Sequence, residues 1–276
     1  MWFQSPAYLK WSRMQLLPQE HLKDVISTLG LRGGEHVLDV GCGTGEFTQY
    51  LSQGVTCSFT GIDLEEKLIE AANNRGLDQI MFLQGDALQL PFADNSFDVV
   101  VSHAFFTCVS DAWSAMQEMR RVCKPGGRIA SVTAESFSRI PYSMGHYPEY
   151  PWLKEYQVLK EKLDRAFYQL ATVSVAGVPP EEMPRFFYES GLKNITVHQI
   201  GKFFSLSNGN MDAEWKKQYL ECEFEAECSR LWLLGETEQT RYRTLLEQRK
   251  KDLAVQENGI WQWNGGSSLL IVADNV

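Results

Sequence analysis

The sequence of 276 residues lacks the marks of membrane proteins, metalloproteins and general nucleic-acid-binding proteins. No stretch approaches the roughly 18 apolar residues of a spanning helix, and the N-terminal segment lacks the apolar core of a signal peptide. Six cysteines include no Cys-x-x-Cys pair, which predicts reduced thiols, no metal site and a cytoplasmic location. Acidic residues outnumber basic ones by 35 to 26, so neither nucleic acid nor an anionic membrane is an expected partner.

The chain does have a regular alternation of short apolar runs and helical patterns. The apolar runs are continuous, as strands buried on both faces require. The alternation predicts crossover connections and a parallel sheet. A helix should begin at an Asp111 cap and stop at the Pro-Gly-Gly of 125–127. The predicted strands cover 36–40, 57–63, 80–86, 97–103, 128–134, 194–201 and 267–274, and predicted helices include 46–54, 64–76, 111–124 and 179–191.

Two long insertions, 137–177 and 203–264, interrupt this pattern. Segments of this length in a compact domain are usually functional, so we expect helical lids that form a binding site. Simple thickening of the fold or a dimer contact are the alternatives, and either a monomer or a homodimer is compatible with the sequence. The expected architecture is one doubly wound α/β domain over 1–276. Its core would comprise about 31–136, 178–202 and 265–276.

The stretch LDVGCGTGEF follows the first predicted strand. Gly41 permits a tight turn, whereas Gly43 and Gly45 remove side chains where a ligand would touch the backbone. We expect the amides from Cys42 to Gly45 to point outward, near the start of a helix. A dinucleotide-binding loop has its third glycine at the position of Glu46, and a carboxylate there repels a pyrophosphate. The loop is therefore poorly suited to a dinucleotide.

Aspartates stand at the ends of the first three predicted strands. Asp39 can accept hydrogen bonds from an ammonium group but repels phosphate. Asp63 stands where an acid typically binds the two hydroxyls of a ribose, with Leu64 as an apolar floor for a base. Asp86 can accept from an amine such as adenine N6, beside the backbone of Ala87. Together they predict an adenosine-bearing ligand that has a cationic part and no phosphate.

With these features the sequence resembles the class I S-adenosylmethionine-dependent methyltransferases. It is most similar to the small-molecule methyltransferases related to ubiquinone-biosynthesis enzymes. The resemblance implies a Rossmann-like sheet of seven strands with an antiparallel last strand, and S-adenosyl-L-methionine as cofactor. The matching segments are VLDVGCGTG (37–45), GID (61–63), GDALQLPFADNSFDVVVS (85–102) and VCKPGGRI (122–129).

The resemblance also assigns parts of the cofactor to residues. The amino-acid moiety falls to Asp39 and the glycine loop, the ribose to Asp63, and the adenine to Asp86 and Ala87. His103 falls where the family contacts the methionine part and the acceptor, commonly through its backbone. The predicted cofactor site therefore comprises Asp39, Gly41, Cys42, Gly43, Gly45, Asp63, Leu64, Asp86, Ala87 and His103.

Catalysis is expected to be in-line transfer of a methyl group to a small-molecule acceptor, by positioning and exclusion of water. The catalytic residues stay unknown; His103 and His146 are the candidates for a general base, should the acceptor need one. Glu135 is a candidate for binding a cationic acceptor. The aromatic residues of the first insertion either wall the acceptor pocket or pack the insertion; they are Tyr142, Tyr147, Tyr150 and Trp152.

Two other functions remain open on the sequence. The chain could methylate a protein or nucleic acid, or it could bind S-adenosylmethionine without catalysis. The acidic balance disfavours RNA. The end of the fourth predicted strand, SHAFF, differs from the Asn-Pro-Pro-Tyr type used on amides and base amines.

Overall fold

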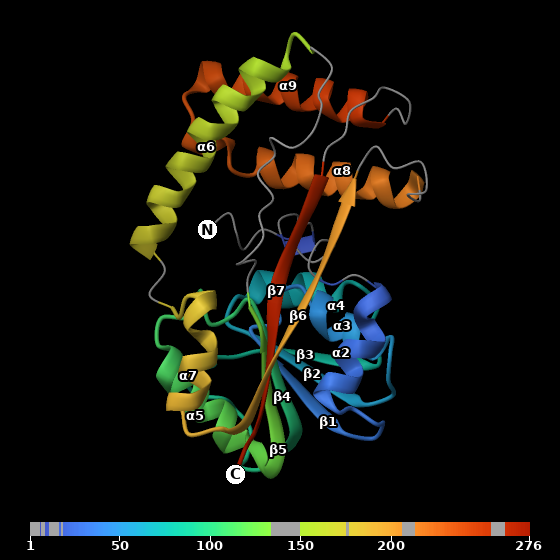
Figure 1. The fold of residues 1–276 in the computed structure, drawn as a ribbon, viewed down its shortest axis with the longest axis vertical. Helices are drawn as coiled ribbons and strands as arrows, with labels where there is room; N and C mark the ends of the chain where they lie inside the picture. The colour runs from blue at the N-terminus through green and yellow to red at the C-terminus, as the bar shows by residue number, and fades with distance from the viewer. Residues whose placement is uncertain are drawn as a thin grey trace. The chain divides into compact units, whose positions relative to one another are not determined.

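The chain divides into two compact units (Figure 1). The computed structural model describes residues 6, 9–10, 17, 19–133, 150–174, 177–205, 213–254 and 263–276. We call the first unit the sheet unit; it comprises Gln15–Ser138, Val175–Lys202 and Gly266–Val276. We call the second the helical unit; it comprises Met1–Met14, Arg139–Ser174 and Phe203–Gly265.

The sheet unit is built on a seven-stranded sheet in the order β3-β2-β1-β4-β5-β7-β6. The pairs β1–β2, β1–β4, β2–β3 and β4–β5 are parallel, and β5 pairs with β7 antiparallel. The predicted fold, including the antiparallel last strand, is therefore confirmed. The strands are β1 (His36–Val40), β2 (Ser58–Asp63), β3 (Ile80–Gln84), β4 (Phe97–His103), β5 (Cys123–Val132), β6 (Lys193–Ser205) and β7 (Trp263–Asp274).

Helices cover both faces of this sheet, and α2, α3, α4, α5 and α7 each bury apolar side chains against it. Side chains alternate along β1, so that Val37 packs with α2, α3 and α4, whereas Leu38 and Val40 pack with α5 and α7. The predicted cap of α5 is confirmed, because Asp111 accepts from the Ser114 amide at 3.0 Å. The helices are η2 (Gln19–His21), α2 (Leu22–Leu29), α3 (Glu46–Ser52), α4 (Glu66–Asn73), α5 (Ala112–Val122), η4 (Pro180–Glu182) and α7 (Met183–Glu189).

Most predicted boundaries differ from the observed ones by a few residues, and two of these differences are informative. The third strand ends at Gln84 rather than at Asp86. The fifth strand begins at Cys123, so that the Pro-Gly-Gly segment lies inside it instead of forming a loop. The cause is a long-range pairing: Gly126 N–H donates to the Asn275 carbonyl at 2.7 Å, and Asn275 N–H donates to the Gly127 carbonyl at 2.9 Å. The bonds to Asn275, near the far end of the chain, thus keep this segment in the strand, although Gly126 has a left-handed φ of 74°.

The helical unit contains α6 (Leu153–Ser174), α8 (Ala213–Cys228), η5 (Leu231–Leu233) and α9 (Glu236–Ala254). Tyr156, Leu163 and Tyr242 are central to its own apolar cluster. Among the described residues, no helix of the chain is long and apolar enough to cross a lipid bilayer.

The interior of the helical unit also holds charges. Arg249 pairs with Glu223 at 2.8 Å, and both side chains are less than 10% exposed. The carboxylate of Glu227 accepts from the Tyr156 hydroxyl at 3.3 Å and from the Tyr242 hydroxyl. Burial opposes the ionisation of Glu227, but the surrounding positive charges hold its pKa at about 2. The Glu227 carboxylate is therefore ionised and compensated.

Arg121 of α5 holds the connection between β3 and β4, the segment with the family-specific sequence LPFADNSFD. Its guanidinium donates to the carbonyls of Leu90, at 2.9 Å, and Phe92, at 2.8 Å. It also pairs with Asp94 at 2.8 Å and Glu118 at 2.7 Å. The segment is thus fixed by one side chain from a neighbouring helix, and its motif has a structural explanation.

We predict that Arg121→Ala destabilises the sheet unit by about 2 kcal/mol, because it leaves two carbonyls without their donor and takes the guanidinium away from the Glu118 carboxylate. Chemical denaturation followed by circular dichroism measures this change. Arg185→Ala is the control. Arg185 is exposed and pairs only with residues three or four positions away, Glu182 and Glu189, so its loss should change stability little. If Arg121→Ala unfolds at the same denaturant concentration as the wild-type protein, the role assigned to Arg121 is contradicted.

Candidate functional site

The glycine loop after β1 has the backbone shape that its sequence predicts. Gly41 and Gly45 have φ angles of 71° and 79°, in the left-handed region that favours glycine. A Cβ atom at Gly41 would lie 2.4 Å from the ring of Phe105, and one at Gly45 would lie 2.5 Å from the ring of Phe82. The sequence interpretation of Gly45, as room for a ligand, missed this reason: the space is needed for an aromatic ring of β3.

The amides of the loop are bonded within the protein. Gly41 and Cys42 donate to the Ile62 carbonyl at 2.8 and 3.0 Å, and Gly45 donates to the Cys42 carbonyl at 3.0 Å. Gly43 donates to Oδ2 of Asp63 at 2.8 Å. The expectation that the amides from Cys42 to Gly45 point outward is therefore wrong for Cys42, Gly43 and Gly45. The end of β2 takes the amides of Gly41, Cys42 and Gly43 because it lies in register with the end of β1.

Asp63, the last residue of β2, is bonded to the loop that follows β1. Besides the Gly43 amide, its carboxylate accepts from the Glu65 amide at 3.0 Å. Burial raises the pKa of the Asp63 carboxyl group, and these backbone donors partly oppose that rise. Next to it, the Leu64 side chain is 61% exposed. A ribose acid with an apolar neighbour, as predicted, is compatible with this geometry.

Asp39 is buried at the end of β1, with 1% of its surface exposed. Its Oδ2 accepts from the Thr48 hydroxyl at 2.6 Å. Thr48 lies in the first turn of α3, so this bond joins the strand to the helix across the glycine loop. The sequence interpretation missed Thr48, although a threonine three residues past Gly45 was the available signal.

Asp86 lies two residues beyond β3 and is exposed. Its Oδ1 accepts from the Leu88 amide at 2.9 Å, so the segment turns locally. The preceding residue, Gly85, donates to the Asp63 carbonyl at 2.9 Å. Asp86 and the half-buried Ala87 come directly after Gly85 in the chain. Because Gly85 is bonded to Asp63, the segment with Asp86 and Ala87 begins beside the end of β2.

His103 ends β4 and is buried, with 2% of its surface exposed. Its ring packs against the ring of Phe47 of α3, with centroids 5.3 Å apart. Phe106, three residues on, is fully buried against Phe186 and Phe187 of α7 and accepts from the Val178 amide at 2.8 Å. The loop after β4 is thereby fixed, and the packed ring of His103 favours a contact through its backbone over a role as base.

Several predicted residues lie outside the described part of the chain, namely Glu135, Tyr142, His146 and Tyr147. Tyr150 and Trp152 are described. The Trp152 indole N–H donates to Asp252 at 2.7 Å, and its ring contacts those of Tyr150 and Tyr156. Trp152 therefore packs within the helical unit. This is the second of the two alternatives given for the aromatic residues of the first insertion, packing of the insertion rather than lining of a pocket.

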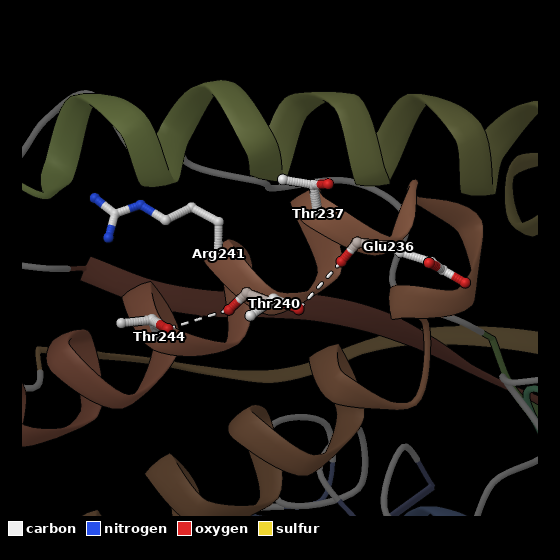
Figure 2. A pocket seen from close by; sticks show the side chains of 5 residues that line it. All are labelled: Glu236, Thr237, Thr240, Arg241 and Thr244. Carbon is white, nitrogen blue, oxygen red and sulfur yellow. Dashed lines mark hydrogen bonds between the residues drawn. The ribbon is translucent and has the colours of Figure 1, made fainter.

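An open depression on α9 is a second place to consider (Figure 2). It is lined by Glu236, Thr237, Thr240, Arg241 and Thr244. The hydroxyls of Thr240 and Thr244 donate to carbonyls of their own helix at 3.2 and 3.1 Å. Arg241 pairs with Glu155 of α6. These groups are engaged with one another, and nothing in the depression selects a ligand.

The residues at the strand ends fit a particular ligand chemistry. Asp39, Asp63 and Asp86 offer carboxylate oxygens, which accept hydrogen bonds and attract positive charge. An ammonium group, ribose hydroxyls and an adenine amine are all donors. Of the loop amides from Cys42 to Gly45, those of Cys42, Gly43 and Gly45 are bonded within the protein. The ammonium group of an amino acid and the hydroxyls and amine of an adenosine fit this set.

Comparison with known proteins agrees with this chemistry. Residues 38–131 match the family model described as a methyltransferase domain. Demethylmenaquinone methyltransferase of Staphylococcus aureus (strain JH9) is 33% identical over 196 residues, which cover 64% of this chain and 76% of the relative. The fold, the site and these relatives define a class I S-adenosylmethionine-dependent methyltransferase, with S-adenosylmethionine as methyl donor. Within that class, the chain belongs to the family of the demethylmenaquinone methyltransferases as a distant member.

Solved structures show the same fold. A candidate methyltransferase from Bacillus halodurans is 21% identical, with a TM-score of 0.51, over 93% of this chain and 99% of its own. The cyclase SpnF is 17% identical, with a TM-score of 0.51, over 93% of this chain and 80% of its own. Because a cyclase shares the fold, the fold alone does not specify the reaction.

We predict that Asp63→Asn weakens the binding of S-adenosylmethionine by about tenfold or more, because a charge-assisted acceptor is lost. The asparagine side chain would also direct its own N–H groups at the Gly43 or the Glu65 amide, so that two hydrogen-bond donors face each other. Isothermal titration calorimetry gives the dissociation constant. Asp78→Asn, which changes an exposed aspartate in the same unit, serves as the control. Equal affinities of Asp63→Asn and wild type would contradict the role of Asp63.

The pH dependence of binding should follow the same residue. Because burial raises the pKa of Asp63, its carboxylate takes up a proton at a higher pH than an ordinary aspartate does. Binding is expected to be constant above that pKa and to weaken as the pH falls through it. Titrations from neutral to mildly acidic pH should show this component in wild type and lack it in Asp63→Asn. Identical pH profiles of the two proteins would rule Asp63 out as its source.

Proposed function

We propose that this methyltransferase acts on a small molecule. The observation that carries the proposal is the 33% identity to demethylmenaquinone methyltransferase, a protein whose named substrate is a small molecule. The net charge of −9 agrees with it, because nucleic-acid substrates favour a basic surface.

The cofactor is held, in this proposal, along the ends of three adjacent strands. Asp39 and the glycine loop, Gly41 to Gly45, bind the amino-acid end. Asp63 binds the ribose hydroxyls, and Leu64 packs against the adenine. Asp86 and Ala87 bind the exocyclic amine and the edge of the adenine. The support is the chemistry of the donors and acceptors and the order of the residues along β1, β2 and β3.

The bound cofactor supplies a methyl group that its sulfonium charge already activates. The protein's contribution is then to orient the acceptor in line and to exclude water. His103 contributes through its backbone, since its ring is packed against Phe47. The loop after His103 is a rigid wall, because Phe106 anchors it on α7 and Val178.

Acceptor recognition is assigned to the two insertions, 137–177 and 203–264. The helical unit has a core of its own around Tyr156 and Tyr242, so its helices can present side chains without support from the sheet. Insertions in a fold used for many reactions are where acceptor specificity can vary. His146 belongs to the first insertion and stays a candidate base there.

The acceptor class can be tested with labelled methyl groups. Purified enzyme is incubated with methyl-tritiated S-adenosylmethionine and either a low-molecular-weight metabolite extract, total RNA or total protein. We expect label in the low-molecular-weight fraction, at a rate that Asp63→Asn lowers by about tenfold or more at limiting cofactor. A quinol lacking its ring methyl group is one defined acceptor to include. Label in RNA or protein, with none in small molecules, would overturn the proposal.

A further inference from the structure

Arg75 joins the end of one helix to the glycine loop, 31 residues upstream. Its Nη1 donates to the Thr44 carbonyl at 2.6 Å and lies 3.3 Å from Oε1 of Glu46. Its Nη2 donates to Oε1 of Gln49. Arg75 stands just past α4 and before Gly76, whose left-handed φ of 67° ends the helix.

The partners of Arg75 span the junction between the loop and α3. Thr44 is in the loop and buried, with 3% of its surface exposed. Glu46 is the first residue of α3 and accepts from the Thr44 hydroxyl. Gln49 lies one turn on. Between them is Gly45, in the left-handed conformation that turns the chain from loop to helix. Arg75 therefore holds both sides of that turn with one planar guanidinium.

Arg75 also offsets negative charge at the loop. The pKa of the Cys42 thiol is raised well above its ordinary value, first by burial and then by the carboxylates of Asp39, Asp63 and Glu46. Three carboxylates thus act on one loop residue. The Arg75–Glu46 pair, with side chains 27% and 16% exposed, is only partly screened by solvent.

We propose that Arg75 is a positioning residue that holds the glycine loop in the shape required by the amino-acid end of S-adenosylmethionine. It acts through Thr44 and Glu46 and touches neither the ribose nor the reacting methyl group. This inference rests on the proposed role of the loop in binding the amino-acid end of the cofactor.

Three ligands separate this role from general stabilisation. S-adenosylmethionine and S-adenosylhomocysteine carry the amino-acid end, whereas 5′-methylthioadenosine shares the adenosine and the sulfur but lacks that end. In Arg75→Ala we expect the dissociation constants of the first two to rise about tenfold, and that of 5′-methylthioadenosine to stay unchanged. Arg75→Lys should lie between wild type and Arg75→Ala, because it keeps the charge near Glu46 but cannot make all the bonds.

Arg32→Ala is the matched control, since Arg32 is an exposed arginine that precedes β1, at the opposite end of that strand from the loop. It should bind all three ligands as wild type does. If Arg75→Ala does not fold, Arg75→Gln removes the charge with less loss of side-chain volume and is expected to show the same selective loss.

Two results would overturn the inference. One is unchanged affinity for S-adenosylhomocysteine in folded Arg75→Ala or Arg75→Gln. The other is an equal loss of affinity for all three ligands, which a merely structural role produces. Both readouts are binding constants and need no acceptor. A failure to methylate small molecules would therefore contradict the proposed function while leaving this test intact.

Discussion

The site depends on one constraint, the bonding of the β1 loop to the end of β2. The carbonyl of Ile62 and the carboxylate of Asp63 together take the amides of Gly41, Cys42 and Gly43. Parallel pairing places Val40 beside Ile62, so the loop begins where these acceptors are. The start of α3, the bond from Thr48 to Asp39 and the reach of Arg75 to Thr44 all follow from that placement.

The strands and the acids at their ends could be predicted because their signals are local. A continuous apolar run marks a buried strand, and an aspartate just after it marks the sheet edge. Distant contacts could not be predicted in the same way. Gly45 is small because of Phe82, 37 positions away, and the Pro-Gly-Gly segment belongs to β5 because of its bonds to Asn275. Arg75 follows a helix and gives no pattern that relates it to the loop.

The two units are stabilised differently. The sheet unit buries mainly apolar side chains, with Asp39 among them, whereas the helical unit buries an ion pair, Glu223–Arg249. Removing one partner of a buried ion pair such as Glu223–Arg249 leaves an uncompensated charge, which typically costs about 3–5 kcal/mol. Glu223 and Arg249 can therefore be replaced without this cost only if both are replaced together.

The inward bonding of the loop amides has a thermodynamic consequence. Fixing the backbone of a residue costs conformational entropy, roughly 1–2 kcal/mol each, and here the sheet fixes the loop as the protein folds. A cofactor that docks on such a loop does not have to order it, which preserves its binding energy. A change that loosens the bonds between the carboxyl ends of β1 and β2 leaves the loop less ordered in the folded protein, even if it does not contact the ligand. Part of the entropic cost of ordering the loop is then paid on binding instead of on folding.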